Sequence, residues 1–245
     1  MKAIILAAGR GSRLKGFTED KPKSMSLVGG KRLIEWQISA LKKAGIIDIS
    51  LVVGFKSEEL MAYGNKHYFN DIWDETNMVY SLLCAKEEFT EKVIVSYSDI
   101  IYSSDIVRDL LNDIHDISIS YDINWYNLWS DRFENPLDDA ETFLINDKNR
   151  VLDIGKKPTS VNDVQGQYMG LLALSPKACR WIIDFEENNS SLTKELDMTS
   201  LLRKLIEGDN LVYGIPNKLP WFEVDTISDL EIANSYYKKR IITYP

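Results

Sequence analysis

The sequence predicts an α/β fold built on a mixed, mostly parallel sheet flanked by helices. Residues 2–8 form an apolar run that ends in a glycine-rich turn, which is typical of a buried parallel strand. Strand-like and helix-like segments then alternate through the first half, and such βαβ units place parallel strands side by side. The 245 residues contain no Pro-, Gly- or Ser-rich linker and no internal repeat. We therefore expect one domain over residues 1–245.

The elements of the first half follow from their periodicity and stop signals. Apolar residues recur at helical spacing over residues 33–44 and stop at Gly45, the expected kind of helix end. A strand over residues 47–53 is closed by Gly54. The alternation continues with a helix over 58–63, a short strand near Tyr68, a helix over 79–88 and a strand over 93–97.

The second half has a less regular pattern. Strands are expected over residues 117–123, 142–146 and 151–154, and within the apolar run 168–174. Helices are expected over residues 177–187, 199–207 and 227–239.

Composition excludes several classes of function. The chain has 29 Lys and Arg residues against 37 Asp and Glu residues, a formal net charge of −8, so a nucleic-acid or anionic-membrane partner is disfavoured. Cys84, Cys179, His67 and His115 cannot form a zinc cluster of the usual spacing. No apolar stretch approaches the ~20 residues that span a bilayer. A reduced, cytoplasmic protein is the simplest expectation.

A glycine-rich loop after the first predicted strand carries the strongest chemical signal. It is Leu-Ala-Ala-Gly-Arg-Gly-Ser-Arg-Leu at residues 6–14, followed by Asp-Lys-Pro-Lys at residues 20–23. Glycines let backbone N–H groups approach phosphate oxygens, and two basic side chains add positive charge, so the loop predicts a triphosphate cradle. A tight turn with solvated basic residues is the alternative. The predicted nucleotide contacts here are Leu6, Ala7, Ala8, Gly9, Gly11, Ser12, Arg13 and Lys23.

Two acidic residues follow strand-like runs and are the predicted metal ligands. Asp99 ends Ser-Tyr-Ser-Asp after the strand over 93–97, and Asp225 ends Glu-Val-Asp at residues 223–225. Ligands of parallel sheets bind outside the carboxyl ends of strands, so Asp99 should face the glycine loop. Mg²⁺ typically takes one or two carboxylates together with phosphates. A helix cap or a solvated turn is the alternative role for each residue.

These motifs together resemble the sugar-phosphate-type nucleotidyltransferase family, whose signature is Leu-Ala-Ala-Gly-x-Gly-Ser/Thr-Arg-Leu/Met followed by Pro-Lys. The match covers residues 3–41 closely. Residues 77–82 (Asn-Met-Val-Tyr-Ser-Leu) and 221–225 (Trp-Phe-Glu-Val-Asp) are similar to the small cytidylyltransferase branch, which includes phosphocholine cytidylyltransferases. Residues 128–141 also resemble the L-glutamine-phosphate cytidylyltransferases of capsule modification.

The resemblance implies a Rossmann-like nucleotidyltransferase fold and a Mg²⁺-dependent cytidylyltransferase. In that reaction a phosphorylated acceptor attacks CTP, releases pyrophosphate and forms a CDP-linked product, here for capsule or cell-surface polysaccharide. Lys23, Arg13, Asp99 and Asp225 take the catalytic roles, the two acids as Mg²⁺ ligands. CTP and a small phosphorylated substrate are the implied partners, and a homodimer is left open.

Further residues are assigned to the base and to the acceptor. Amide and hydroxyl groups near the start of the helix over 79–88 could contact a pyrimidine edge, namely those of Asn77, Tyr80 and Ser81. A helix N-cap is the competing role of Asn77. The family often has a lysine before proline that meets the acceptor phosphate, which favours Lys157, with Lys156 next. The other acceptor candidates are Trp129, Arg132, Glu141, Trp221 and Glu223.

The prediction of the acceptor depends on which charged groups the site would have to bind. Trimethylammonium binds aromatic faces, whereas a phosphorylated amino acid needs acceptors for its ammonium and donors for its carboxylate or amide. Residues 128–141 are dense in polar groups, which favours L-glutamine phosphate narrowly over phosphocholine. A charged surface loop is the alternative explanation.

Three other functions stay open. A sugar-1-phosphate nucleotidyltransferase using CTP or UTP belongs to the same family. A nucleotide-dependent glycosyltransferase usually shows Asp-x-Asp, where this chain has Tyr97 at the first position. An inert nucleotide-binding subunit would have no need to retain the basic and acidic residues named above.

Overall fold

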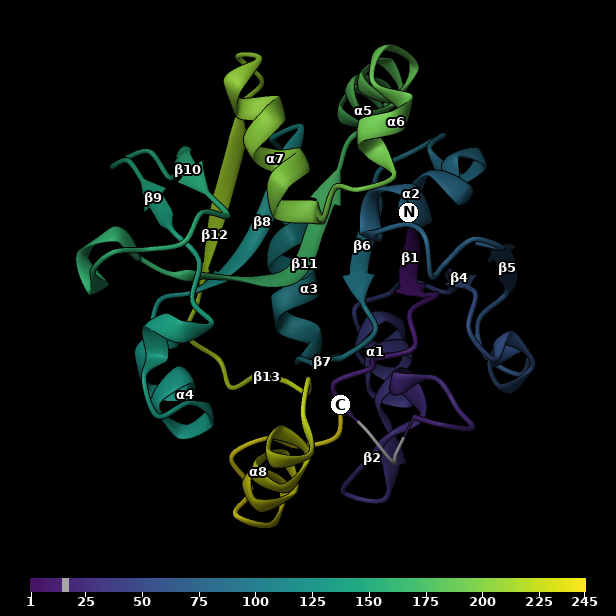
Figure 1. Cartoon of the computed structure of the whole chain (residues 1–245), viewed down its shortest axis with the longest axis vertical. Coiled ribbons are helices and arrows are strands. Elements are labelled where there is room, and N and C mark those ends of the chain that lie inside the picture. Colours follow the sequence, from purple (N-terminus) through teal and green to yellow (C-terminus); the bar gives the residue numbers. More distant parts are fainter. Residues whose placement is uncertain (15–17) are drawn as a thin grey trace.

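The structure is a computed structural model that describes residues 1–14 and 18–245. Its main sheet has seven strands in the order β12-β8-β11-β6-β1-β4-β5 (Figure 1). Strand β11 runs antiparallel to both of its neighbours, and the other four pairs are parallel. The predicted mixed, mostly parallel sheet is confirmed. The strands are β1 (Lys2–Ala7), β4 (Asp48–Val53), β5 (Lys66–Phe69), β6 (Val93–Tyr97), β8 (Ile117–Asp122), β11 (Gln167–Leu174) and β12 (Val212–Asn217).

Helices cover both faces of the sheet, because inner strands such as β1 are apolar on both sides. In β1, Ala3, Ile5 and Ala7 join one hydrophobic core with α1 and α3, whereas Ile4 and Leu6 join a second core with α2, α5 and α7. The helices are α1 (Leu33–Lys43), α2 (Met78–Cys84), α3 (Ser104–Asn112), α4 (Trp125–Arg132), α5 (Pro176–Asn188), α6 (Ser190–Thr193), α7 (Met198–Glu207) and α8 (Ile227–Lys238).

Three two-stranded ribbons accompany the main sheet. They pair β2 (Leu27–Val28) with β3 (Lys31–Arg32), β9 (Phe143–Ile145) with β10 (Val151–Ile154), and β7 (Ile100–Ile101) with β13 (Phe222–Glu223). In the β7–β13 ribbon Glu223 pairs with Ile100, and the Val224 N–H donates to the Asp99 carbonyl at 2.9 Å. Figure 1 shows β13 leading into α8, which packs against α4. The ribbon therefore brings two acidic segments together that lie far apart in the sequence.

Some predicted elements are wrong. Residues Ser57–Leu60 form a 3₁₀ turn in place of the helix predicted over 58–63, and the turn follows Lys56 with a left-handed φ of 49°. The helix predicted over 79–88 ends at Cys84, and a 3₁₀ turn follows over Lys86–Glu88. Elements α3, α4 and β12 were not predicted. Strand β12 contains Gly214 and a proline, which are depleted in strand interiors, and its place at the sheet edge tolerates them.

Two further expectations concern the environment of the chain. In the part of the chain that the structure describes, no helix combines the length and apolar character that crossing a bilayer requires. Cys84 and Cys179 are both free thiols, and Cys179 is buried.

Lys92 caps the carboxyl end of α3. Its Nζ donates hydrogen bonds to the carbonyl oxygens of Leu110 (2.9 Å), Leu111 (3.1 Å) and Asp113 (2.6 Å). Because charged hydrogen bonds contribute more than neutral ones, we expect Lys92→Met to lower the free energy of unfolding by about 2 kcal/mol and the Tm by roughly 4–8 °C. Thermal unfolding measures this, with the exposed Lys86→Met as control. Equal Tm values for the two variants would contradict the capping role.

Candidate active site

A cavity of about 220 Å³ lies beside the glycine loop, at the carboxyl ends of β1 and β6. Three segments supply its walls: the loop after β1, the turn after β6 and the chain leading into α2. The lining residues are Leu6, Ala8, Gly9, Gly11, Arg13, Lys23, Trp73, Thr76, Asn77, Met78, Ser81, Tyr97, Ser98 and Asp99. The sheet thus places the glycine loop and Asp99 at one edge, as parallel strands require.

Glycine stands at positions 9 and 11 of the loop for different structural reasons. Gly11 has a φ of +72°, and a Cβ at this position would lie 2.6 Å from the Cβ of Lys23. Only glycine therefore lets the loop backbone pack directly on the lysine side chain. A Cβ at Gly9 would have no heavy atom within 4 Å among the described residues. The backbone at Gly9 is therefore open to the approach of a ligand.

Lys23 places its ammonium group between two carboxylates. Its Nζ lies 2.8 Å from Asp99 Oδ2 and 2.5 Å from Asp225 Oδ1, and its side chain is 11% exposed. Burial alone would lower the pKa of Lys23, but the two carboxylates outweigh burial and raise that pKa above its usual value. Lys23 is therefore a positive charge at neutral pH on the wall of the cavity.

Asp99, Glu223 and Asp225 form a cluster that we call the carboxylate trio. One oxygen from each residue lies within 4.8 Å of the other two. Asp99 Oδ1 is buried and has no hydrogen-bond partner among the described residues. A set of oxygen ligands with one unsatisfied oxygen suits a hard divalent cation such as Mg²⁺. The trio therefore fits the metal that the sequence predicts at Asp99 and Asp225, and it adds Glu223 as a third candidate ligand.

Neighbouring charges act differently on two members of the trio. Burial disfavours the charged form of Asp225, but Lys23 and Arg13 hold the pKa of this carboxyl below its usual range. Burial and the charge of Asp225 together raise the pKa of Glu223 well above its usual range. A divalent cation beside the trio would favour the ionised form of Glu223, because opposite charge stabilises a carboxylate.

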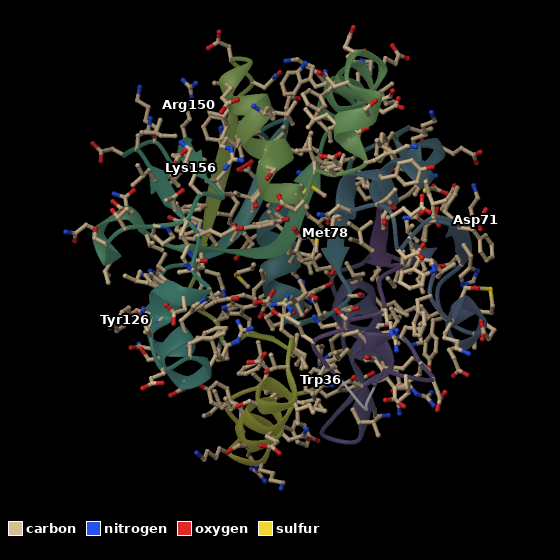
Figure 2. The ribbon with its side chains drawn as sticks, viewed as in Figure 1. Trp36, Asp71, Met78, Tyr126, Arg150 and Lys156 are labelled. Atoms are coloured by element: carbon tan, nitrogen blue, oxygen red, sulfur yellow. The ribbon has the colours of Figure 1, made fainter. Side chains whose placement is uncertain are left out.

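A second cavity of about 270 Å³ adjoins the first, and Arg13, Met78 and Tyr97 line both. Figure 2 shows Met78 near the centre of the molecule. The other residues that line the second cavity are Trp129, Asp139, Glu141, Gln167, Tyr168, Gly170, Asp197, Thr199, Glu223 and Asp225. Because Asp99 lines the first cavity and the other two members of the trio line the second, the trio lies where the cavities meet.

The second cavity is rich in acids. Burial, followed by the charge of Asp197, raises the pKa of Glu141 to about 7. Thr199 Oγ1 donates to Glu141 Oε1 at 3.3 Å. Burial also raises the pKa of Asp139, whose Oδ1 lies 4.0 Å from Arg13 Nη1. A cavity with these acids favours a ligand that carries positive charge.

Most of the predicted nucleotide contacts line the first cavity. Those that do not are Ala7, whose side chain is buried in a hydrophobic core, and Ser12 and Tyr80. Asn77 lines the cavity and caps α2, since its Oδ1 accepts from the Met78 N–H at 2.8 Å and its Nδ2 donates to the Glu195 carbonyl at 3.2 Å. The capping role that competed with base recognition at Asn77 is therefore present.

The predicted acceptor contacts are divided between the cavity and its surroundings. Trp129, Glu141 and Glu223 line the second cavity. Trp221 is buried and donates from Nε1 to Asp122, and Arg132 is buried in ion pairs with acidic residues. Neither lysine is in the described lining: Lys157 donates to the backbone carbonyls of residues 137 and 138, and Lys156 pairs with Asp153 at 2.7 Å. Figure 2 shows Lys156 beside the β9–β10 ribbon, apart from Met78.

Several lining residues were not among the predicted ones. In the second cavity they include Gln167, Tyr168, Asp197 and Thr199, and in the first cavity Trp73 and Thr76. Asp197 is the N-cap of α7 and accepts from the Ser200 N–H at 2.7 Å. Its sequence signal is that of a helix start, which does not distinguish a cap from a site residue.

Several known proteins are similar to this chain in fold or in sequence over nearly its full length. The inositol-1-phosphate CTP transferase from T. maritima superposes with a TM-score of 0.77 at 21% identity, covering 96% of both chains. The CTP:phosphocholine cytidylyltransferase from Streptococcus pneumoniae superposes with a TM-score of 0.73 at 25% identity, covering 96% of this chain and 97% of that one. The CTP:phosphoglutamine cytidylyltransferase of Campylobacter jejuni is 39% identical in an alignment covering 95% of this chain and 98% of that protein.

A family model agrees with these relatives. The model of the MobA-like NTP transferase domain matches residues 3–137, which is more than half of the chain. The matched segment includes the glycine loop, Lys23 and Asp99, which line the first cavity. The predicted Rossmann-like fold and nucleotidyltransferase class are confirmed. The chain belongs to the MobA-like NTP transferase family and is a nucleotidyltransferase.

Proposed function

We propose that this protein is a Mg²⁺-dependent cytidylyltransferase that joins CTP to a small phosphorylated acceptor, with L-glutamine phosphate preferred and phosphocholine next. The observation that carries this proposal is the pair of adjoining cavities with the carboxylate trio where they meet. The first cavity offers the glycine loop and Lys23 to a triphosphate, and the second offers acids to an ammonium group. The relative at 39% identity, whose name specifies CTP and phosphoglutamine, supports the same substrates.

The proposed reaction needs no general base. An oxygen of the acceptor phosphate attacks the α-phosphorus of CTP, the bond to the β-phosphate oxygen breaks, and pyrophosphate leaves with the electron pair. A phosphate whose second pKa is near ~6 is mostly dianionic at pH 7, so no proton has to be removed. The absence of His67 and His115 from the described lining of both cavities agrees with this chemistry.

The chain's own residues supply position and positive charge. Backbone N–H groups near Gly9 and the Lys23 ammonium would hold the triphosphate and the charge that develops on pyrophosphate. Arg13, which lines both cavities, would contact the acceptor phosphate and the α-phosphate together. Mg²⁺ bound at Asp99 and Asp225, with Glu223 beside them, would neutralise phosphate charge.

We propose a cytoplasmic location, where Cys84 and Cys179 would stay reduced. The CDP-linked product would serve the modification of a capsule or cell-surface polysaccharide, as the sequence resemblance implies. Detection of the protein in the soluble fraction of fractionated cells tests the first statement, and loss of a polysaccharide modification on gene deletion tests the second.

The experiment that tests the proposed function crosses nucleotides with acceptors and measures pyrophosphate release. All four nucleoside triphosphates are paired with L-glutamine phosphate, phosphocholine and a sugar 1-phosphate. We expect CTP with L-glutamine phosphate to give the highest kcat/KM. Preference for phosphocholine would overturn L-glutamine phosphate as the acceptor, and preference for the sugar phosphate would overturn the proposal that the acceptor carries an ammonium group.

Within that experiment, kcat/KM with CTP should exceed kcat/KM with UTP by at least about fivefold. A site that pairs with one exocyclic group leaves its own polar atoms unpaired against the other, at a cost of ~1–3 kcal/mol. Asn77 and Ser81, which line the first cavity, are the proposed contacts to the base. Equal use of the two pyrimidine nucleotides would contradict this assignment.

Glu141→Gln tests the ammonium contact. Since the pKa of Glu141 is raised to about 7, its ionised fraction grows about tenfold between about pH 6 and pH 8. The wild-type KM for L-glutamine phosphate should therefore fall over this range, and Glu141→Gln should have a higher KM at pH 8 with a flatter pH profile. Identical profiles for both proteins would contradict the contact.

A measurement of thermal stability shows whether the higher KM of Glu141→Gln comes from a lost contact or from partial unfolding of the variant. Folded Glu141 keeps a proton that the unfolded chain releases above its ordinary pKa of about 4.5, so its contribution to stability falls as pH rises from about 4.5 to 7. Above pH 7 the neutral glutamine avoids burying that charge. We therefore expect the Tm of Glu141→Gln at pH 8 to be no lower than that of the wild type.

A further inference from the structure

Arg132 is a buried cation that contacts two members of the carboxylate trio. It is the last residue of α4, and its side chain is 0% exposed. Nη1 donates to Glu223 Oε2 at 2.9 Å, Nη2 to Asp225 Oδ2 at 3.3 Å, and Nε to Asp229 Oδ1 at 2.9 Å. All three guanidinium nitrogens are therefore bound to carboxylates.

Asp229 connects this arginine to the turn that carries Asp225. It lies in the first turn of α8 and is 1% exposed. Its Oδ2 accepts from the backbone N–H groups of Asp225 at 3.0 Å and Thr226 at 2.9 Å, and from Arg132 Nη2 at 3.4 Å. The guanidinium, the turn and the start of α8 thus form one hydrogen-bonded unit.

On each of the two trio members that it contacts, Arg132 uses one carboxylate oxygen and leaves the other oxygen to the site. On Asp225 it contacts Oδ2, whereas Oδ1 faces Lys23 and Arg13. On Glu223 it contacts Oε2, and Oε1 has no hydrogen-bond partner among the described residues. A lysine would balance the negative charge equally well, but only the planar fork of an arginine fixes several carboxylates in defined orientations.

We propose that Arg132 is a positioning residue, which orients Glu223 and Asp225 so that their remaining oxygens face a divalent cation. This inference rests on the cation site of the proposed function and does not depend on the identity of the nucleotide or acceptor. Removing a partner that orients metal ligands typically costs 10–100-fold in metal affinity. A residue that only stabilises the fold would change the Tm and leave the affinity of the folded protein unchanged.

The test measures the binding of Mn²⁺ to the protein without nucleotide. Electron paramagnetic resonance monitors this binding, at a temperature below the Tm of each variant. We expect Arg132→Lys, which keeps the charge and loses the fork, to raise the Kd for Mn²⁺ by about 10–100-fold. Arg203→Lys is the matched control, because Arg203 donates to the Gly155 carbonyl and has no described contact with the trio. Asp229→Asn keeps an oxygen that accepts from the N–H groups of the turn, but it removes the negative charge that faces Arg132. This variant should therefore also raise the Kd for Mn²⁺.

The outcomes separate the inference from the proposed function. A folded Arg132→Lys protein whose Kd lies within about twofold of the wild type would overturn the positioning role. If that variant does not fold, Asp229→Asn decides, and an unchanged Kd there would overturn the role as well. A wild-type protein that does not bind Mn²⁺, or a Kd that Asp225→Asn leaves unchanged, would overturn the cation site itself.

Discussion

Asp99→Asn and Asp225→Asn are each expected to lower kcat/KM by about 1,000-fold, the largest effect in the proposed site. An amide keeps the shape of the carboxyl but removes its charge, and metal stabilisation of phosphate charge contributes several kcal/mol to such transition states. At Asp99, whose buried Oδ1 has no partner among the described residues, the asparagine also replaces one of the two oxygens with an NH₂ group that cannot bind a cation. Pyrophosphate release measured across a Mg²⁺ titration should show both the lower rate and a need for more Mg²⁺.

The control for these two variants is Asp147→Asn, because Asp147 lies exposed in a turn. It should retain wild-type kcat/KM at every Mg²⁺ concentration. Full activity of either site variant at limiting Mg²⁺ would show that the residue is a structural acid and not a ligand. Because Lys23 contacts both acids, the Tm of each variant should be measured beside its activity.

The fold could be predicted wherever one apolar periodicity dominates a segment. Strand β1 is apolar on both faces, and Gly45 directly follows the C-cap of α1, so both were predicted close to their observed bounds. Helix α4 was not predicted, although Trp125, Leu128, Trp129 and Arg132 are buried at the spacing of one helix face. The last of these is charged, and only its carboxylate partners on β13 and α8 make it an inward-facing residue.

The nucleotide side of the site could be predicted further than the acceptor side. Lys23 stands in the Asp-Lys-Pro-Lys motif, and Asp99 and Asp225 follow strands. The structure brings the Lys23 ammonium within hydrogen-bond distance of both carboxylates. The second cavity takes residues from β11 and α7 that carry no local motif. Their place depends on the antiparallel insertion of β11 between β6 and β8, which local sequence patterns do not specify.

Lys23→Ala is expected to lower kcat/KM by at least about 100-fold, the scale of losing one preorganised contact to the transition state. The Lys23 side chain is 11% exposed on the wall of the first cavity, where its ammonium would bind the triphosphate and the leaving pyrophosphate. The control is Lys21→Ala, an exposed lysine of the same loop, which should keep near wild-type turnover. Pyrophosphate release under saturating L-glutamine phosphate measures both variants.

The sign of the effect on cation binding separates Lys23 from the acids that it contacts. Removing the ammonium leaves Asp99 and Asp225 with more uncompensated negative charge, so Lys23→Ala should bind Mn²⁺ at least as tightly as the wild type. The asparagine variants of the two acids should lose both turnover and Mn²⁺ affinity. If Lys23→Ala kept its turnover, the lysine would only pair the two acids in the absence of ligands, and the triphosphate would have to be held by the glycine loop and Arg13 alone.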